Sequence, residues 1–268
     1  MSASKVVLLT GGSSGIGRAI ALQLSQKGTK IVVAARNESQ LKSTVQQCKK
    51  RGAQACYFIA DVRDRDQCKA MVQYTIQQYG RIDVLILNAG ISLHTPFENL
   101  VEEDLELYKK LIDVNYFGYL YPTFYALPHL KASKGSIGVV SSLSGQIGLP
   151  FRTGYCASKF AVQGFFESLR TEIGDQVSIT IVSPGSVASN MRDNSLHGKK
   201  EGDIKFNESE ESRMSVEEAA QEIARAVSER RGNVILTFSG KLGVILKPIV
   251  PSLIERMAIK KAGGVSKL

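Results

Sequence analysis

The chain has 268 residues, of which 43% are hydrophobic and 22% charged, and its formal net charge is +9. These proportions are ordinary for a globular protein, and the length accommodates one large α/β domain or two small ones. The four cysteines form no CxxC pair and the three histidines are scattered, which argues against a disulfide framework and leads us to expect no metal site.

The sequence contains no pattern typical of export or membrane insertion. Residues 1–12 lack a charged segment followed by an apolar one, and no run of about 18 apolar residues occurs. We therefore expect a cytoplasmic protein that is not secreted and has no transmembrane segment. The positive charge suits nucleic acid, but the basic residues do not cluster with aromatic ones on any predicted helix, so no nucleic-acid partner is expected.

Short apolar runs rich in β-branched residues predict strands buried on both faces. They lie at 5–10, 30–35, 55–60, 83–87, 136–141, 178–183 and 233–237. Segments with helical periodicity separate them, for example 17–28 and 64–80, and this alternation indicates βαβ units and a parallel sheet. We predict an α/β fold: a single Rossmann-type domain with a doubly wound parallel sheet of about seven strands, flanked by helices and occupying residues 1–237.

The first strand leads directly into a glycine-rich turn, TGGSSGIG. Its glycines are spaced GxxxGxG, and residues without a Cβ let backbone N–H groups approach a phosphate. The following helix would direct its N-terminus at a pyrophosphate. A glycine-rich turn alone is weak evidence, but its place in the first βαβ unit favours a dinucleotide site. The predicted site residues are Thr10, Gly11, Ser13, Ser14, Gly15, Ile16 and Gly17.

The end of the second strand predicts which dinucleotide binds. An acidic residue there would hold the ribose 2′-hydroxyl of NAD, whereas an arginine suits the 2′-phosphate of NADP. The strand ends in Ala35, Arg36 and Asn37, without a carboxylate. We therefore predict NADP(H) as the cofactor, with Arg36 and Asn37 in its site; the alternative is that Arg36 is only an exposed loop residue.

Later strand ends add residues to the same crevice, because ligands of open α/β sheets bind outside the carboxyl ends of the strands. Asp61 and Val62 follow the third strand, where the carboxylate would reach an adenine amino group. Asn88, Ala89 and Gly90 follow the fourth strand, where small residues let the backbone approach a ribose.

A serine, a tyrosine and a lysine follow the fifth strand. Ser142 ends the strand, Tyr155 comes 13 residues later, and Lys159 lies one helical turn further on. A nearby ammonium and an oxidised nicotinamide would lower the pKa of the phenol, so Tyr155 would act as general acid in carbonyl reduction and as base in the reverse direction. Ser142 would hydrogen-bond the same carbonyl oxygen. Each residue taken separately has a structural alternative: a packed tyrosine, a serine at a strand end, or a lysine that extends to solvent.

Three features occupy the rest of the chain. The sixth strand is followed by Pro184, Gly185, Val187 and Ser189, and residues 190–214 are polar and charged, which predicts a mobile substrate loop. Residues 238–268 form an apolar C-terminal extension with interspersed lysines, broken by prolines and too short to span a bilayer. This extension predicts either a flap over a hydrophobic pocket or a peripheral membrane contact. A helix pair that covers the core or a subunit interface is the alternative.

The motifs TGGSSGIG, ADV, LNAG, DVNYFG, VSS, YCASK and SPGSV, in this order, make the chain resemble the short-chain dehydrogenase/reductase family over nearly its whole length. The resemblance implies hydride transfer between a nicotinamide and a ketone or secondary alcohol. It also implies that Lys159 holds the nicotinamide ribose, that Asn115 holds a water in a proton relay, and that the segment from Pro184 to Ser189 contacts the carboxamide. Family members pair the helices that correspond to 103–130 and 160–169 across a two-fold axis, so a homodimer or homotetramer is expected.

Within the family, the chain most resembles the branch of 11β-hydroxysteroid dehydrogenase and its dehydrogenase/reductase relatives, through TGGSSGIG, AARNESQL and the apolar, basic C-terminal extension. Residues 141–161 also resemble 3-ketodihydrosphingosine reductase. Both resemblances imply a hydrophobic, steroid- or lipid-like substrate. A 3-oxoacyl-carrier-protein reductase is a further alternative, since a basic surface suits an acidic carrier. An NADP-binding redox sensor without turnover is the alternative from another class.

Overall fold

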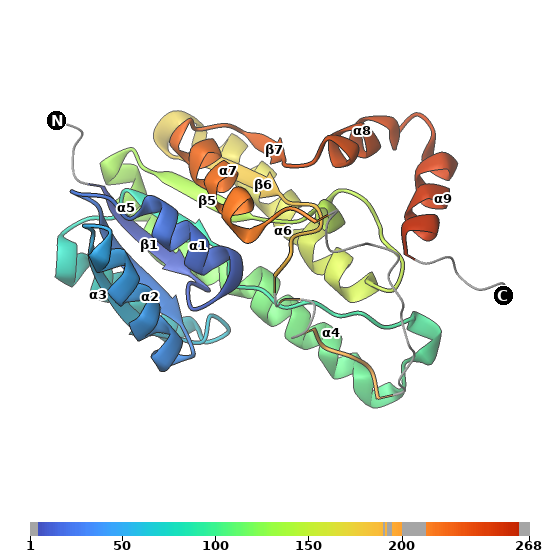
Figure 1. Ribbon diagram of the computed structural model, residues 1–268, viewed down its shortest axis with the longest axis horizontal. Helices are drawn as coiled ribbons and strands as arrows, with labels where there is room; N and C mark the ends of the chain where they lie inside the picture. Colours follow the sequence, from blue (N-terminus) through green and yellow to red (C-terminus); the bar gives the residue numbers. More distant parts are fainter. Residues whose placement is uncertain (1–4, 190, 192–194, 200–212, 263–268) are drawn as a thin grey trace.

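The computed structural model describes residues 5–189, 191, 195–199 and 213–262 (Figure 1). Its strands form one parallel sheet in the order β3-β2-β1-β4-β5-β6-β7, which confirms the predicted fold class. The strand order reverses between β1 and β4, and open α/β sheets bind their ligands at such a reversal. The strands are Val6–Thr10 (β1), Lys30–Ala35 (β2), Gln54–Ile59 (β3), Val84–Leu87 (β4), Ser136–Val140 (β5), Ser178–Ser183 (β6) and Asn233–Ile235 (β7).

The central strands are mostly apolar because both faces of the sheet are buried, and their few polar residues are small hydroxyl side chains such as Thr10 and Thr180. Val7 and Leu9 of β1 belong to the hydrophobic cluster on one face, and Leu8 belongs to the cluster on the other. Successive side chains of a strand point to opposite faces, so a strand covered on both sides needs apolar residues at every position.

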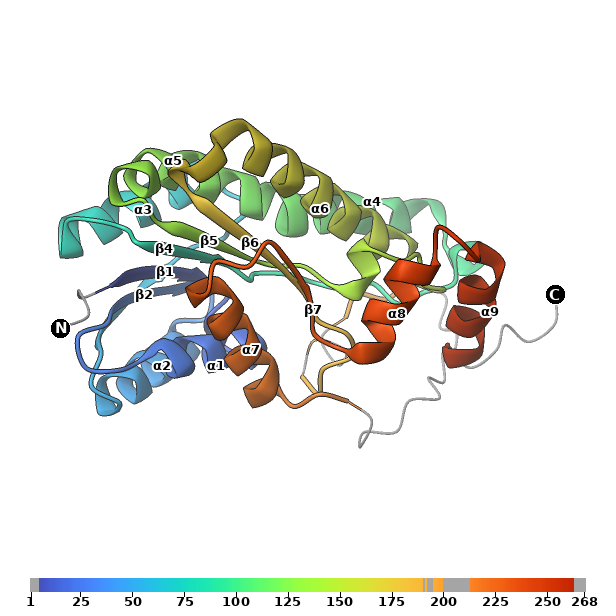
Figure 2. The ribbon, with the colours of Figure 1, turned by 90° about the horizontal axis from the view of Figure 1, so that it is seen from above.

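Helices cover each face of the sheet (Figure 2). One layer contains α1 (Gly15–Leu24), α2 (Glu38–Lys50) and α7 (Val216–Ser228), and the other contains α3 (Arg65–Tyr79), α5 (Gly118–Ser133) and α6 (Thr153–Ile173). Short 3-10 helices occur at Phe97–Asn99 (η1), Glu102–Asp104 (η2), Leu143–Gly145 (η4) and Gly174–Gln176 (η5).

The segment 103–130, which the family resemblance treats as one helical element, is divided in the structure. Helix α4 spans Leu105–Ile112, and a π-helix, η3 (Asp113–Phe117), joins it to α5. A π-helix has a wider turn than an α-helix and often occurs at functional sites. In this chain the wider turn contains Asn115, whose buried side chain binds residues outside the helix.

Two helices of the C-terminal extension lie beyond the carboxyl ends of the strands (Figures 1 and 2): α8 (Phe238–Leu246) and α9 (Pro251–Lys261). Lys247 attaches them to the rest of the molecule, because its Nζ donates to the Gln146 carbonyl at 2.9 Å and lies 5.1 Å from the centroid of the Phe160 ring. Within the described part of the chain, no helix combines the length and the apolar character needed to cross a membrane.

The predicted substrate loop, residues 190–214, falls mostly outside the described residues. Its described portion, 195–199, lies along the segment that follows β4. Leu196 donates its N–H to the Ser92 carbonyl at 2.8 Å, and the Gly198 N–H donates to Thr95 Oγ1 at 2.9 Å.

Candidate active site

The glycine-rich turn leaves an open space at the carboxyl end of β1. Gly11 and Gly15 have φ values of 69° and 50°, in the left-handed region that favours glycine. A Cβ on Gly11 would lie 2.7 Å from the Ala89 Cα, so this glycine permits close backbone packing. Among the described residues, a Cβ on Gly15 would meet only the Ser189 Cβ, at 3.9 Å. The described residues therefore leave the backbone of Gly15 open on this side.

The start of α1 suits an anion. Ser14 occupies the N-cap position, but its side chain does not cap the helix, and the first turn contains no acidic residue. The first backbone N–H groups of a helix have no partner within the helix, and the helix dipole adds partial positive charge there. A pyrophosphate at this end would meet both features.

Thr10 and Asn88 join the glycine-rich turn to the end of β4. The Asn88 side-chain amide donates to the Gly11 carbonyl at 3.0 Å and the Thr10 carbonyl at 3.3 Å, and the Asn88 N–H donates to Thr10 Oγ1 at 3.1 Å. These two predicted cofactor residues therefore stabilise the turn through each other.

Two arginines lie near Asp61 at the ends of β2 and β3. Arg63 donates from Nη2 to Asp61 Oδ2 at 2.6 Å and from Nε to both carboxylate oxygens. This hydrogen bonding holds the pKa of Asp61 below its usual value, and the charge of the exposed Arg36 adds to the effect. Asn37, also predicted to contact the cofactor, has a structural role, because its Oδ1 accepts the Gln40 N–H at 3.1 Å and so caps α2. Sequence reasoning missed Arg63, although it lies only two residues after Asp61.

Ser142 lies where β5 ends, and its hydroxyl already has an acceptor role. Its Oγ accepts the N–H of Ser144 at 3.1 Å, which leaves the hydroxyl hydrogen for another acceptor. The next residue, Leu143, donates its N–H to the Pro184 carbonyl at 2.8 Å. The segment after β6, including the predicted Gly185, is thereby held beside Ser142.

The segment after β6 is also attached to the start of α7. The N–H of Ala188 donates to the Met214 carbonyl at 2.9 Å, and Val187 pairs with Met214. Ser189 lies at the open side of Gly15. The structure thus brings the predicted residues after β1 and β6 to one crevice.

Tyr155 and Lys159 lie on the buried stripe of α6, with 6% and 2% of their surfaces exposed. Lys159 Nζ donates to the Val140 carbonyl at 3.0 Å and to the Tyr119 hydroxyl at 3.3 Å. It lies 6.0 Å from the centroid of the Tyr155 ring. Burial lowers the pKa of Lys159 to about 7, because desolvation disfavours the charged ammonium.

The predicted lowering of the Tyr155 pKa combines the Lys159 ammonium with an oxidised nicotinamide, and in the structure burial acts against it. Burial raises the pKa of Tyr155 above its ordinary value, while the Ser142 hydroxyl and the charge of Arg152 act in the opposite direction. Lys159 donates its hydrogen bonds to Val140 and Tyr119 instead of the Tyr155 hydroxyl. Tyr155 is therefore a protonated phenol at neutral pH.

Asn115 is fully buried, and both the oxygen and the nitrogen of its side-chain amide form hydrogen bonds. Its amide donates to the Ile91 carbonyl and to Ser158 Oγ, both at 2.9 Å, and its Oδ1 accepts the Ile91 N–H at 2.9 Å. A Cβ on Gly90 would lie 3.3 Å from Asn115 Oδ1 and 3.8 Å from Lys159 Nζ. Asn115 thus fixes the backbone after β4 close to the lysine.

A small pocket of about 80 Å³ lies beside Ser142. Its lining is mostly apolar, with Leu143, Leu149, Pro150, Ala258 and Ala262 among the contributing residues. Helix α9 and its C-cap therefore form part of the wall next to the predicted catalytic serine.

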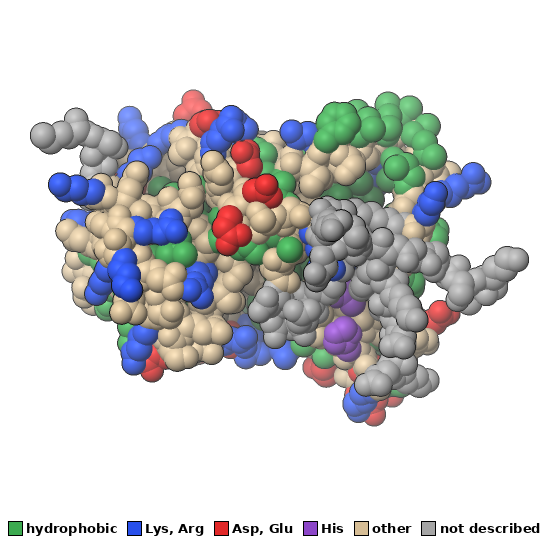
Figure 3. Space-filling view, viewed as in Figure 1, with side chains coloured by type: hydrophobic (Ala, Val, Ile, Leu, Met, Phe, Trp, Pro, Cys, Tyr) green, Lys and Arg blue, Asp and Glu red, His purple; other side chains and the backbone are tan. Residues whose placement is uncertain are grey.

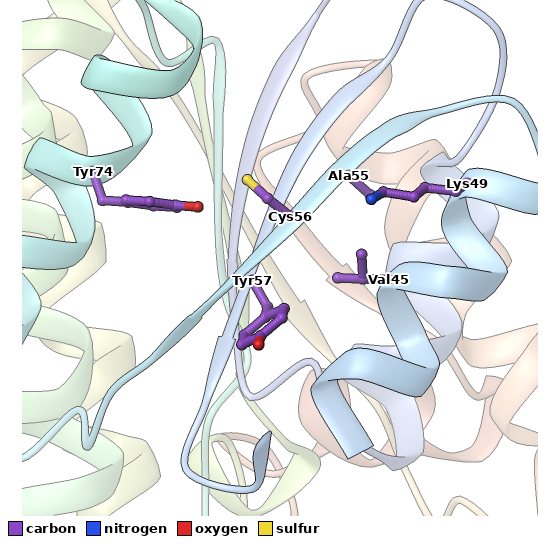
Figure 4. A pocket seen from close by; sticks show the side chains of 6 residues that line it. All are labelled: Val45, Lys49, Ala55, Cys56, Tyr57 and Tyr74. Carbon is purple, nitrogen blue, oxygen red and sulfur yellow. The ribbon is translucent and has the colours of Figure 1, made fainter. Parts of the chain in front are cut away.

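A larger hollow of about 380 Å³ lies elsewhere, at the edge strand β3 between α2 and α3 (Figure 4). The residues that line it include Lys49, Cys56 and Tyr74, and none of the predicted site residues. Size alone does not identify the site in this molecule.

Comparison with known proteins supports a single family. A family model described as short chain dehydrogenase matches residues 5–200. An 11-beta-hydroxysteroid dehydrogenase of Pinus massoniana is 39% identical over 208 residues, which cover 76% of this chain and 57% of that protein. An 11-beta-hydroxysteroid dehydrogenase A of Sesamum indicum is 38% identical over 190 residues, covering 70% of this chain and 54% of that protein. The chain thus spans little more than half the length of these two relatives.

A third relative matches along most of both chains. The dehydrogenase/reductase SDR family protein 7-like of Dictyostelium discoideum is 35% identical over 271 residues, covering 98% of this chain and 84% of that protein.

Solved structures share the fold. A short-chain dehydrogenase/reductase from Burkholderia phymatum in complex with NAD has a TM-score of 0.81 at 22% identity, covering 94% of this chain and 95% of that one. An alcohol dehydrogenase from Thermococcus sibiricus in complex with 5-hydroxy-NADP has a TM-score of 0.75 at 23% identity, covering 87% and 95%.

Proposed function

The chain belongs to the short-chain dehydrogenase family, and from this premise we propose that it transfers a hydride between NADP(H) and a ketone or secondary alcohol on a hydrophobic molecule. The observation that carries the proposal is the proximity of Ser142, Tyr155 and Lys159 at the end of β5: the Ser142 hydroxyl interacts with the Tyr155 phenol, and Lys159 Nζ lies 6.0 Å from the centroid of the Tyr155 ring. A fold alone does not imply this activity, because function depends on the side chains of the site.

The residues of the crevice fit a dinucleotide phosphate. The space beside Gly15 and the uncapped start of α1 suit the pyrophosphate. Arg36 supplies positive charge at the end of β2, which favours a 2′-phosphate and hence NADP(H) over NAD(H), whereas the charge of Arg63 is paired with Asp61. The other holding residues would be Val62, Asn88, Ala89, Gly90, Pro184, Gly185, Val187 and Ser189, with Ile16, Ser13 and Ser14 at the turn.

In the proposed reaction, NADPH supplies the hydride when it is bound. Tyr155 donates a proton to the carbonyl oxygen of the substrate, a role that a buried, protonated phenol suits. Ser142 donates a hydrogen bond to the same oxygen as negative charge develops on it. Lys159 holds the ribose, and Asn115 keeps the neighbouring backbone in place for a water that returns the proton to Tyr155.

The pocket beside Ser142 has apolar side chains together with polar ones, among them Arg152, and its volume of about 80 Å³ suits only the part of a hydrophobic substrate next to the reacting carbonyl. Names of the relatives from pine and sesame agree with a hydroxysteroid. A buried apolar lining binds an apolar molecule through the area that both remove from water.

We further propose that α8 and α9 contact an anionic membrane surface. Their large apolar side chains are exposed, with Phe238 of α8 at 81% and Met257 of α9 at 57%, and Figure 3 shows apolar groups gathered over these helices with Lys and Arg beside them. Residues 238–262 contain a single acid, Glu255. An exposed apolar face edged by basic residues is typical of a segment that lies on anionic lipid.

A self-complementary dimer contact through the same helices is less favourable. A two-fold axis would bring the basic side chains of one copy against the same side chains of the other. We place the subunit contact of the proposed homodimer on α5 and α6 instead.

Cofactor titration tests the proposed reaction. Fluorescence titration should give tighter binding of NADPH than NADH, and Arg36→Asp should weaken NADPH by about tenfold while changing NADH little. Absorbance of the reduced cofactor should then fall on addition of steroid or long-chain ketones. Tight cofactor binding without turnover of any ketone or alcohol would support the redox-sensor alternative. An equal loss of affinity for NADPH and NADH in Arg36→Asp would mean that Arg36 does not contact the 2′-phosphate.

Vesicle sedimentation tests the membrane contact. The protein should bind vesicles that contain phosphatidylserine more than phosphatidylcholine vesicles, and less in high salt. The double variant Leu253→Ser, Met257→Ser should lose most of this binding, whereas Phe97→Ser, which alters an apolar side chain 63% exposed elsewhere, should keep it. Equal binding to both kinds of vesicle, together with unchanged binding of the double variant, would contradict the proposal.

A further inference from the structure

Tyr119 is a buried polar residue that the proposed reaction does not use. None of its surface is exposed, and it lies on α5 one helical turn after Asn115. Its hydroxyl donates to the Val140 carbonyl at 2.8 Å and accepts a hydrogen bond from Lys159 Nζ at 3.3 Å. Lys159 Nζ also lies 5.0 Å from the centroid of the Tyr119 ring.

The Val140 carbonyl closes a triangle of hydrogen bonds. It accepts from both Tyr119 and Lys159, the latter at 3.0 Å. Val140 is the last residue of β5, two positions before Ser142. The triangle therefore connects α5 and α6 with the strand that carries the predicted catalytic serine.

Lys159 needs these acceptors because a buried ammonium is costly unless it is hydrogen-bonded. Among the described residues, no carboxylate forms an ion pair with it, and the titratable groups that face it are the phenols of Tyr119 and Tyr155. The Tyr119 hydroxyl gives its own hydrogen to Val140, so its lone pairs face the ammonium. The ring face adds a cation–π contact.

We propose that Tyr119 is a positioning residue that keeps Lys159 charged and in place beside Tyr155. This inference rests on the proposed function, in which Tyr155 and Lys159 act together. The alternative is a core tyrosine whose hydroxyl is satisfied by Val140 and has no effect on the lysine.

The variant Tyr119→Phe tests the proposal, with Tyr125→Phe on the same helix as control, since the Tyr125 ring packs on Phe124. The alkaline limb of the ketone-reduction profile should move down by about one pH unit, the size expected for one lost hydrogen bond to a charged group. Below the limb the rate should stay within about twofold of the parent, because Lys159 is protonated again. An unchanged profile, or an equal loss of rate at every pH, would overturn the proposal.

A second readout does not depend on turnover. In protein labelled with ¹³C-lysine, the Cε resonance of Lys159, identified by its absence in Lys159→Met, should titrate about one pH unit lower in Tyr119→Phe than in the parent and in Tyr125→Phe. An unchanged midpoint would overturn the role of Tyr119. Failure of the parent to reduce any ketone would instead contradict the proposed function, and this titration would still report on Tyr119.

Discussion

At the scale of single residues, burial favours the neutral forms of both Tyr155 and Lys159. It raises the pKa of the phenol and lowers the pKa of the ammonium to about 7. Their spacing of one helical turn is visible in the sequence, whereas the depth at which they are buried depends on α5, β5 and the segment after β4. We therefore expect substitution of Tyr155 to change activity, and substitution of Lys159 to change both activity and stability.

Tyr155→Phe should reduce turnover by about a hundredfold or more, the contribution expected of a general acid, while leaving NADPH affinity nearly unchanged. In the parent, ketone reduction should decline as the pH rises, first where Lys159 loses its proton, at its pKa of about 7, and further where the pH approaches the raised pKa of Tyr155, because both groups must be protonated. Alcohol oxidation should rise as the pH increases toward that value, because the base must be deprotonated. Steady-state rates in both directions across pH check this, and unchanged turnover in Tyr155→Phe would exclude it as the proton donor.

Lys159→Met should abolish turnover and yet stabilise the fold. The pKa of a lysine is about 10.4 in an unfolded chain, whereas the pKa of Lys159 in the folded protein is about 7. Between these two pH values the unfolded state therefore binds more protons than the folded state. Stability therefore increases with pH across this window, and the full cost of the buried charge is present below it. Methionine should add about 1–2 kcal/mol near neutral pH, with a smaller gain near about pH 10. Thermal unfolding of the parent and the variant at both pH values measures this difference in stability. A variant less stable than the parent at neutral pH would contradict the prediction.

At the scale of elements, the site depends on how closely α1 packs on the glycine-rich turn. A Cβ on Gly17 would lie 2.2 Å from the Gly11 carbonyl oxygen and 2.3 Å from Asn88 Nδ2, so it would displace the amide that stabilises the turn. The geometry of the crevice thus depends on a contact between α1 and the end of β4.

Gly17→Ala should lower the free energy of unfolding by about 1–3 kcal/mol, the usual cost of overpacking, and weaken NADPH binding as well. Gly232→Ala is the matched control, because its Cβ would meet only Arg170 side-chain atoms at ordinary contact distances of 3.7 Å or more. Urea unfolding and cofactor titration of both variants check the prediction. Equal effects of the two substitutions would mean that the contact between α1 and Asn88 does not shape the site.

At the scale of the whole molecule, two surfaces of the described residues carry the most exposed apolar side chains. One is the α8–α9 face already proposed for lipid, and the other includes Phe124 on α5, which is 70% exposed. Large exposed apolar groups often mark an interface. We propose the α8–α9 face for a membrane and the face around Phe124 for a second copy of the chain.

Phe124→Asp should shift the proposed homodimer toward monomer, because a carboxylate would be buried without a partner at the contact. Light scattering coupled to gel filtration measures the mass. Phe97→Asp, which changes a similarly exposed phenylalanine outside α5 and α6, should leave the mass unchanged. A monomeric parent protein would contradict the expected dimer directly.

The sequence by itself determined the strands, their parallel order and the family. Continuous apolar runs predicted all seven strands nearly to their observed bounds, since a strand covered on both faces must be apolar at every position. The motifs after β1, β4 and β5 are local in sequence, and the fold necessarily brings strand ends to one edge.

Only the tertiary structure decided the surroundings of these residues. Three features depend on contacts between segments or on small changes in helix geometry. They are the ion pair between Arg63 and Asp61, the π-helix that contains Asn115, and the hydrogen bond from Lys159 to Tyr119. The sequence predicted a phenol pKa lowered by Lys159 and an oxidised nicotinamide, but it does not show that burial of Tyr155 acts in the opposite direction, because desolvation depends on what packs around a side chain and not on its neighbours in sequence.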